Sequence, residues 1–593
     1  MFLTRPEIAG TFGVAASTHW IATAVAMAVL ERGGNAADAA VAAGFTLQIV
    51  EPHLNGPGGD CPIIVHDAGK NTQSVICGQG VAPAGLTVAH VKGELGLDLI
   101  PGTGLLPAMV PGAFDAWATL LRDHGTMRLG EVMDYAIGYA TNGAHMVPRV
   151  VATLETVRPL FEAEWPTSAA LWLRDGGPKA GGLWRNPTLA ATWNRVLAEA
   201  RRADREEEIE AARNVWYRGF VAEAIGRFST STVSLDASGK RHRGVITADD
   251  LANWRAPVEA PASYTYRGHT VLKVGPWGQA PAYLQTLSLL SGFDLAGMDP
   301  LGERYIHTIV ECMKLAYADR EAFYGDPDFC DVPLEALLSE TYAAERRKLV
   351  TEEASLTLRP GTLPGRVTPW VDHGAEARAA ILTAIPGAGE PTVARLGASG
   401  GDTCHIDVID RWGNMVSATP SGGWLQSSPA IPELGFCLGT RGQMFWLDET
   451  LPNGLKPGKR PRTTLSPGMV LRDGKGWMSF GTPGGEQQDQ WQIMMLTRMI
   501  DHAMGIQEAI DAPSFHSEHW PSSFWPRVAR PGKVVIEGRY APDVATALAA
   551  RGHRVTVGGD WSEGRLTGAR REPDGQMFAG ANPRGMQGYA AGR

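Results

Sequence analysis

The sequence has few cysteines and no dense run of positive charge. Its 593 residues include six cysteines and carry a formal net charge of -9. The cysteines form no CxxC pair, so neither a zinc knuckle nor a disulfide framework is indicated, and the usage fits a reducing compartment. The absence of a Lys/Arg block argues against nucleic acid and against an anionic membrane as partners. The six are Cys61, Cys77, Cys312, Cys330, Cys404 and Cys437.

The sequence also lacks a long apolar run and the usual motifs of cofactor sites. Residues 20–30 are the most apolar early stretch, and they are too short to span a bilayer. Residues 1–7 contain no basic region leading into an apolar core, so we expect no signal peptide and a cytoplasmic protein. Residues 58–60 lack the lysine of a P-loop, and residues 516–519 (His-Ser-Glu-His) depart from HExxH spacing. We therefore expect no phosphate site, no metal and no cofactor.

What is present is the composition of a globular enzyme, with 44% hydrophobic and 20% charged residues. The length suits two or three ordinary domains or one large layered domain. Residues 17–50 predict two packed helices. Ser17 or Thr18 is expected to cap the first, and Asn35 the second, with Asp38 in the capping-box position.

A change in local composition marks the middle of the chain. Residues 303–323 have apolar side chains at helical spacing. Residues 360–402 are rich in proline and end in a glycine-rich run, which predicts a flexible surface segment. Strand-like alternation follows at 404–410 and 415–418, with a turn between them. Strands flanked by long apolar helices indicate a layered α/β architecture.

Thr403 stands where this flexible segment meets the first of the two strands. A threonine that opens a strand is usually structural, but a hydroxyl nucleophile can use its own free N-terminal amine as the base. That chemistry requires cleavage between Asp402 and Thr403. The preceding residues 397–401 match GxSxG formally, yet they lack the strand before and the helix after that a nucleophile elbow needs. Cys404 lies one step along the strand and should point to the opposite face, into the core.

Residues 401–417 closely resemble the processing-site strand of the gamma-glutamyltranspeptidase family of N-terminal-nucleophile hydrolases. Other segments match that family in the same order along nearly the whole chain, which is far more specific than a single motif. They are residues 33–40, 317–320, 325–327, 459–461, 466–467, 483–485 and 582–584.

The resemblance implies the fold and the catalytic groups. We expect an α+β protein, a four-layer αββα sandwich formed jointly by two subunits cut from one precursor. The large subunit would be residues 1–402, with a processing segment at about 386–402, and the small subunit residues 403–593. Thr403 would be both nucleophile and autocleavage residue, and Ser421 would supply a second hydroxyl that hydrogen-bonds it. Gly484 and Gly485 would form the oxyanion hole, which suits glycines because no Cβ obstructs their N–H groups.

Substrate recognition departs from the family pattern. The family clamps the α-carboxylate of a gamma-glutamyl group with an arginine, and Gln79 stands at that position. The family's acid for the α-amino group lies three residues after a glutamine; here Gln443 is kept but Trp446 holds the acid's place. An indole cannot neutralise an ammonium as a carboxylate does, although a cation–π contact is open to it. Gly423 replaces a family asparagine.

Other parts of the expected pocket are kept. The paired hydroxyls on the carboxylate side are Thr463 and Thr464, and Arg462 is a charge beside them. The sequence thus predicts a pocket that still binds an acyl group, with or without a carboxylate, but does not hold glutamate in the usual way.

Three hypotheses follow. The leading one is a threonine-nucleophile amide hydrolase or acyltransferase, acting on a small-molecule amide and not strict for gamma-glutamyl groups. The second is a true gamma-glutamyltransferase or glutathione hydrolase with an altered clamp. The third is an uncleaved, non-catalytic binding protein on the same scaffold. The sequence leaves open a homo-oligomer of the processed heterodimer.

Overall fold

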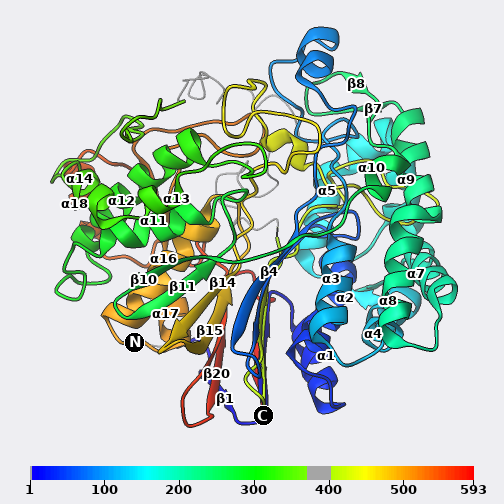
Figure 1. Cartoon of the computed structure of the whole chain (residues 1–593), viewed down its shortest axis with the longest axis horizontal. Helices are drawn as coiled ribbons and strands as arrows, with labels where there is room; N and C mark the ends of the chain where they lie inside the picture. Colours follow the sequence, from blue (N-terminus) through cyan, green and yellow to red (C-terminus); the bar gives the residue numbers. More distant parts are fainter. Residues whose placement is uncertain (1–2, 370–402) are drawn as a thin grey trace.

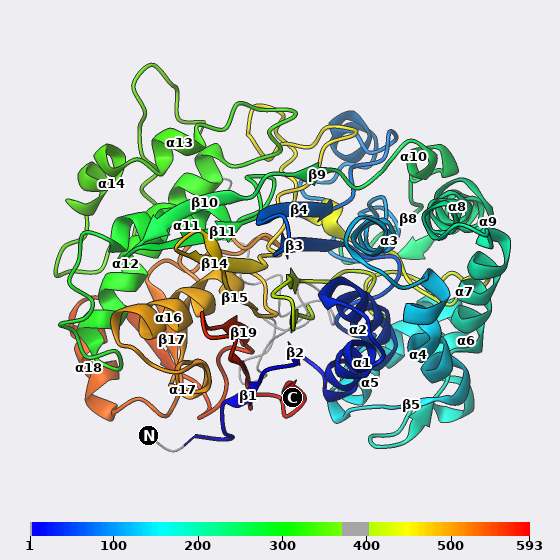
Figure 2. The same cartoon turned by 60° about the horizontal axis from the view of Figure 1, so that its bottom comes forward.

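Two seven-stranded antiparallel sheets lie face to face at the centre of the computed structural model, which describes residues 3–369 and 403–593 (Figure 1). Helices cover the outer face of each sheet, as a second view also shows (Figure 2). The predicted four-layer αββα arrangement is confirmed. The processing segment predicted at 386–402 lies outside the described residues.

The first sheet has the order β1-β20-β19-β15-β14-β11-β10. Its strands are β1 (Ile8–Gly10), β10 (Ala262–Tyr266), β11 (His269–Lys273), β14 (Gly468–Arg472), β15 (Lys475–Gly481), β19 (Thr567–Arg571) and β20 (Met577–Ala581). The second has the order β21-β2-β12-β13-β3-β4-β9. Its strands are β2 (Gly13–Ser17), β3 (Cys61–Asp67), β4 (Thr72–Gly78), β9 (Val258–Glu259), β12 (Ile406–Asp410), β13 (Met415–Ala418) and β21 (Tyr589–Gly592).

The helices form two groups, one on each side. On the second sheet pack α1 (Trp20–Glu31), α2 (Ala36–Val50) and α3 (Ala113–His124), backed by α4 (Leu129–Asn142), α7 (Pro187–Ala200), α8 (Arg205–Arg218) and α9 (Phe220–Ser231). On the first sheet pack α11 (Pro281–Leu290), α16 (Gln487–Asp501) and α17 (Ile506–Asp511), with α12 (Glu303–Phe323) behind α11. A small sheet of β16 (Phe515–Ser517), β17 (Lys533–Ile536) and β18 (Arg554–Val557) adjoins the second group.

The apolar core follows these layers. One cluster joins the second sheet to its helices, another joins the first sheet to its own, and a thinner one lies between the sheets. Residues such as Val14, Ala16 and Ile64 from one sheet meet Leu272 and Met469 from the other. Each strand that lies between layers therefore buries both faces, which fits its mostly apolar sequence.

The helices predicted near the N-terminus are present, with one difference in capping. The Asn35 side chain accepts hydrogen bonds at the start of α2, and Asp38 completes the capping box, as predicted. The first helix is capped by His19, whose side chain accepts from the Ile21 N–H. The prediction of a Ser17 or Thr18 cap is wrong because Ser17 belongs to β2 and the Thr18 hydroxyl donates to a distant carboxylate, Glu51.

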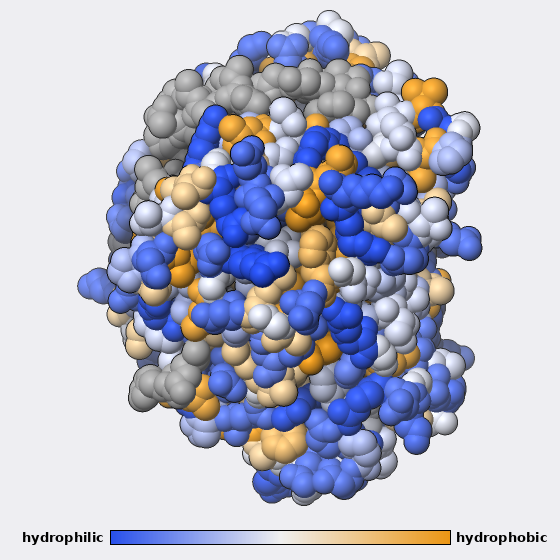
Figure 3. Space-filling view, turned by 90° about the vertical axis from the view of Figure 1, so that its left-hand side faces the viewer, coloured by the Kyte–Doolittle hydropathy of each residue, from blue (hydrophilic) through white to orange (hydrophobic). Residues whose placement is uncertain are grey.

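The middle of the chain also follows the prediction where it is described. The helix expected at 303–323 is α12, and the two strands expected around a turn are β12 and β13, paired from Ile406↔Ala418 to Ile409↔Met415. Among the described residues, no helix is long and apolar enough to cross a membrane. On the face that carries α14 (Glu340–Arg347) and α18 (Pro542–Ala550), hydrophilic residues predominate, with narrower apolar streaks between them (Figure 3).

Candidate active site

Thr403 and Ser421 meet at the open end of the β12–β13 hairpin. The two residues form an antiparallel bridge, and Thr403 Oγ1 lies 3.1 Å from Ser421 Oγ. Ser421 is held on its other side by Asp60, through backbone hydrogen bonds of 2.8 and 2.9 Å. Both hydroxyl-bearing residues are 1% exposed. The contact predicted between the two hydroxyls is present; Asp402, on the other side of the predicted cleavage point, lies outside the described residues.

Cys404 points away from this pair, as the alternation of a strand requires. Its thiol donates to Glu51 at 3.1 Å and accepts from the Asn55 amide at 3.2 Å. Burial raises the pKa of the thiol well above its ordinary value, with the Glu51 charge adding to the effect. A thiol that is buried and protonated is a poor nucleophile. Cys404 is therefore a core residue, in agreement with the sequence.

Gly484 and Gly485 lie between the end of β15 and the start of α16. Gly484 has φ +116°, and a Cβ there would lie 2.7 Å from the Trp491 ring. The Gly485 carbonyl accepts from Gln488 N at 3.1 Å, and from the Gln279 amide at 3.4 Å. The pair stands at the N-terminus of a 15-residue helix, where the helix dipole favours negative charge. This position suits the predicted oxyanion hole.

The segment that precedes the glycine pair packs closely against the strand that follows Thr403. A Cβ at Gly481, three residues before Gly484, would lie 2.2 Å from the ring of His405, two residues after Thr403. Nearby, Ser417 Oγ of β13 donates to the Phe480 carbonyl of β15 at 3.2 Å. The two sheets therefore bring the end of β15 onto the start of β12, so that Thr403 and Gly484 share one edge of the sandwich.

Gln79 is completely buried and lies close to Arg441. Neither polar atom of its amide has a hydrogen-bond partner among the described residues. It lines a cavity of about 10 Å³ together with Asp60 and Arg441, which form an ion pair of 2.7 Å. A cavity of this size holds about one water. The arginine that the family places at position 79 is thus absent, while Arg441 brings a charge to the same cavity from another segment.

The residues kept from the expected pocket differ in how they are bonded. Both ends of the Gln443 side-chain amide bond to other residues of the protein: its nitrogen donates to the Gly102 carbonyl at 3.1 Å, and its oxygen accepts from Trp525 N at 2.9 Å. Thr463 is fixed by its backbone, which forms a parallel bridge with Gly278, five residues after the end of β11. Thr464 Oγ1 is buried and has no hydrogen-bond partner in the described parts of the chain.

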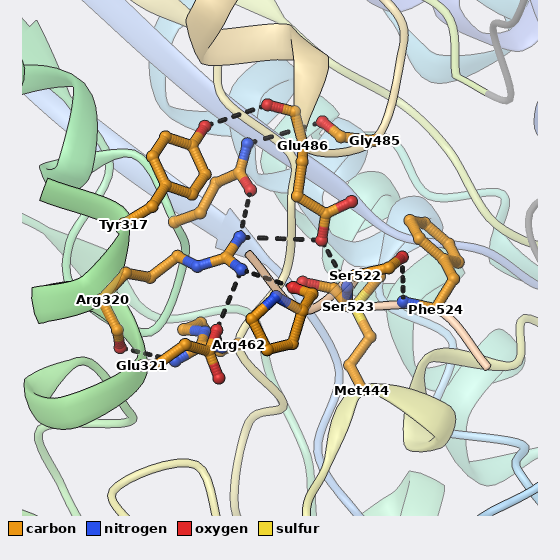
Figure 4. Close-up of polar contacts among 12 residues, drawn as sticks. Tyr317, Arg320, Glu321, Met444, Arg462, Gly485, Glu486, Ser522, Ser523 and Phe524 are labelled. Carbon is orange, nitrogen blue, oxygen red and sulfur yellow. Dashed lines mark hydrogen bonds and ion pairs between the residues drawn. The ribbon is translucent and has the colours of Figure 1, made fainter. Parts of the chain in front are cut away.

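The side chain of Arg462 belongs to a buried ionic cluster (Figure 4). It donates to the Arg320 carbonyl at 2.6 Å and to the Glu321 carboxylate. Arg320 donates to Glu321 at 2.9 Å and lies 3.6 Å from Glu486, the residue after the glycine pair. Sequence reasoning missed Arg320, Glu321 and Glu486, although Arg320 closes the Tyr-Ala-Asp-Arg motif and Glu486 adjoins the Pro-Gly-Gly motif.

Trp446 faces the same cluster. Its indole N–H donates to Glu321 at 3.3 Å, and the guanidinium of Arg527 stacks 3.7 Å from the centroid of its ring. A cation therefore does occupy the ring face, but it belongs to this chain. Nothing in the sequence pointed to Arg527, because it lies 81 residues from Trp446 in a segment without a recognised motif.

The histidines of residues 516–519 are engaged with protein groups. His516 bonds to Glu563 at 2.5 Å, and His519 accepts from Gly532 N at 2.9 Å. A different group within the described residues could in principle hold a metal ion, namely His307, Glu311 and His553. There the two histidines bond to each other at 2.9 Å and Glu311 pairs with Lys314 at 2.6 Å, which favours a polar cluster over a metal centre.

Comparison with known proteins agrees with this geometry. The gamma-glutamyltranspeptidase family model matches residues 22–592. The glutathione hydrolase-like YwrD proenzyme of Bacillus subtilis (strain 168) is 31% identical over 592 residues, 99% of each chain. The solved structure of LmbA2991HD is 55% identical and covers 100% of both chains with a TM-score of 0.93. Cephalosporin acylase from Bacillus halodurans is 28% identical, with a TM-score of 0.82 over 100% of this chain and 98% of that one.

Proposed function

The chain belongs to the gamma-glutamyltranspeptidase family, and from this premise we propose that Thr403 is the nucleophile through which it cleaves small amides. Its family and its relatives make it an amide hydrolase or acyltransferase that matures from a proenzyme. The observation that carries the assignment is the 3.1 Å contact between the Thr403 and Ser421 hydroxyls at the start of β12.

The first reaction is the cut that creates the nucleophile. The Thr403 hydroxyl attacks the Asp402 carbonyl carbon, the peptide C–N bond breaks, and an ester links the two pieces. The Thr403 nitrogen released by this cleavage takes up the hydroxyl proton and becomes a free amine. Water then hydrolyses the ester, so that Asp402 becomes a carboxylate and Thr403 regains its hydroxyl. Ser421 is placed to hydrogen-bond the attacking oxygen and orient it.

The matured site then works on external amides. The free amine of Thr403 takes the hydroxyl proton as the oxygen attacks the substrate carbonyl, and Gly484 and Gly485 stabilise the oxyanion. The C–N bond breaks, the amine product leaves with the proton, and the acyl group stays on Thr403 as an ester. Water releases it in hydrolysis, or an acceptor amine in transfer.

Two features of the pocket support a substrate other than a gamma-glutamyl amide. Gln79 offers a neutral amide where the family has an arginine, and the cavity that it lines, of about 10 Å³, holds about one water. Trp446 replaces the acid that would hold an ammonium, and its ring face is occupied by Arg527. Each lost charged contact would cost about 1.5–3 kcal/mol of binding for a gamma-glutamyl group.

The test begins with the intact mass of freshly purified protein. We expect two fragments of 402 and 191 residues, the smaller one beginning Thr403-Cys404-His405. Thr403→Ala should remain one chain and hydrolyse no amide. Cys404→Ala is the matched control: it removes the neighbouring thiol, which points to the opposite face, and should still mature. A wild-type chain that stays uncut, or a cut chain inactive on a broad amide panel, would contradict the proposal.

A further inference from the structure

A buried ionic cluster next to the glycine pair carries more positive than negative charge. Three guanidinium groups, of Arg320, Arg462 and Arg527, face two carboxylates, of Glu321 and Glu486. The residues are between 0 and 6% exposed. Burial raises the pKa of Glu321, but the charges of Arg462, Arg320 and Arg527 outweigh it and hold that pKa at about 2, so Glu321 is ionised. Three arginines against two glutamates give the cluster one formal positive charge in excess.

All three arginines have an Nε without a hydrogen-bond partner in the described residues, and of the three Arg527 also lacks one at Nη2. Its Nη1 donates to the Met444 carbonyl at 2.6 Å, and its guanidinium stacks on Trp446. Its Nη2 lies 4.0 Å from Glu321 Oε2, beyond hydrogen-bond distance. Neither Nη2 nor Nε has a hydrogen-bond partner among the described residues, although Arg527 is 0% exposed. A buried charged donor without a partner is costly, and an anionic ligand would satisfy it.

The cluster is joined to the site of chemistry by short connections. Arg320 donates to the Gln279 oxygen at 3.1 Å, and the same amide donates to the Gly485 carbonyl. Gln279 also donates its backbone N–H to the Thr463 carbonyl at 2.8 Å. The oxyanion glycines, the threonine pair and the excess cation therefore belong to one bonded unit.

The 3₁₀ turn Arg441–Met444 links this unit to the cavity of Gln79. Arg441, at one end of the turn, lines that cavity. The carbonyl of Met444, at the other end, accepts a hydrogen bond from Arg527. Buried polar groups without a hydrogen-bond partner in the described residues occur next to both ends of this turn, at the Gln79 amide and at Arg527 Nη2, and also at Thr464 Oγ1 of the threonine pair. Such groups in one region indicate a polar ligand, and the excess charge fixes its sign.

We propose that Arg527, stacked on Trp446, recognises a carboxylate at the end of the acyl group remote from the scissile amide and excludes acyl groups that carry an ammonium there. The substrates are then monoamides of dicarboxylic acids. The inference rests on the proposed function of the same site. The ammonium of a gamma-glutamyl group would meet the excess cation of the cluster, so like-charge repulsion adds to the loss of the family's acid.

The test uses three anilides with the same five-carbon acyl chain: glutaryl, gamma-glutamyl and pentanoyl. The matured wild type should prefer glutaryl to both others. Arg527→Gln should lower kcat/KM for the glutaryl anilide about 10- to 100-fold, the effect of losing a hydrogen bond to a charged group. Activity on the pentanoyl anilide should change little. Arg527→Lys keeps the charge but not the planar fork and should recover part of the preference.

Arg530→Gln is the matched control. It removes an arginine three residues along the same segment, one that is 32% exposed and pairs with Glu518, and it should leave all three rates unchanged. Maturation into two fragments shows that each variant has folded. Equal effects of Arg527→Gln on the glutaryl and pentanoyl anilides would overturn the inference, since a structural role affects both.

A binding measurement separates failure of the inference from failure of the proposed function. Glutarate should raise the melting temperature of the matured wild type more than glutamate or pentanoate at equal concentration, and Arg527→Gln should abolish that shift. This result would support the carboxylate site even if no anilide were cleaved. Absence of any glutarate shift in the wild type would refute the site, even with amides hydrolysed.

Discussion

At the scale of single residues, both the backbone conformation and the proposed chemistry require a glycine at position 484. Its φ of +116° lies in a region that residues with a Cβ rarely adopt, and its neighbour Trp491 leaves no space for one. The next residue, Gly485, is held by Gln279 and by the first turn of α16. A change at Gly484 would therefore move the N–H groups proposed to bind the oxyanion.

We expect Gly484→Ala to lower kcat about 100- to 1,000-fold, the usual effect of losing one oxyanion donor, with a smaller change in KM. Gly474→Ala is the matched control, because Gly474 also has a positive φ (+72°) but lies in the open turn between β14 and β15. It should cost about 1 kcal/mol of stability and leave kcat unchanged. Steady-state kinetics and thermal melts of both variants test this prediction. Similar kcat losses in the two would count against a catalytic role for Gly484.

The same scale shows which site residues the sequence could predict. Thr403 and Ser421 belong to one hairpin, so a local motif and a strand pattern were enough to place their hydroxyls together. Arg527 reaches Trp446 from 81 residues away, and Gln279 reaches Gly485 from 206. Such long-range contacts depend on how separate segments pack, and no spacing in the sequence encodes them.

At the scale of elements, the small β16-β17-β18 sheet depends on a buried charge. His516 on β16 is 8% exposed and contacts Glu563 at 2.5 Å and Glu518 at 3.4 Å. Burial alone lowers the pKa of His516, but the two carboxylates outweigh it and raise that pKa to about 9. The histidine is thus a permanent cation at neutral pH that joins β16 to the segment after β18.

This pair predicts a loss of stability at alkaline pH. A histidine whose pKa rises from 6.5 to about 9 on folding stabilises the protein fully below pH 6.5 and loses that contribution as pH rises to 9. The loss amounts to at most about 3 kcal/mol, at 1.36 kcal/mol per pKa unit. We expect His516→Gln to flatten the fall in unfolding free energy between pH 6.5 and 9, measured by denaturant titration. His145→Gln, at an exposed histidine, should keep the wild-type slope; equal slopes in all three proteins would refute the assignment.

Elements with strong local signals were predicted and those shaped by distant partners were not. The second helix forms as expected because Asn35 and Asp38 cap it within four residues. The start of the first helix differs because Thr18 bonds to Glu51, 33 residues away. The ranges of α12 and the β12–β13 hairpin follow their side-chain periodicity, which records which face is buried.

At the scale of the whole molecule, both sheets are built from strands on either side of the proposed cut. In the first sheet β1, β10 and β11 come from residues before 403, and the other four strands come from residues after it. In the second sheet β12, β13 and β21 come from the later part and lie next to β2 and β3 from the earlier part. Each part alone would expose strand edges and one face of the core between the sheets.

The matured protein should therefore behave as one folding unit although it has two chains. We expect the 402- and 191-residue fragments to elute together in size-exclusion chromatography, at the volume of the uncut Thr403→Ala chain, and to unfold in a single transition. Neither fragment expressed alone should give a soluble folded protein, because pairs such as β2–β12 and β11–β14 would lack one strand. Dissociation of the fragments under native conditions, or two separate unfolding transitions, would mean that the interleaved sheets do not hold the parts together.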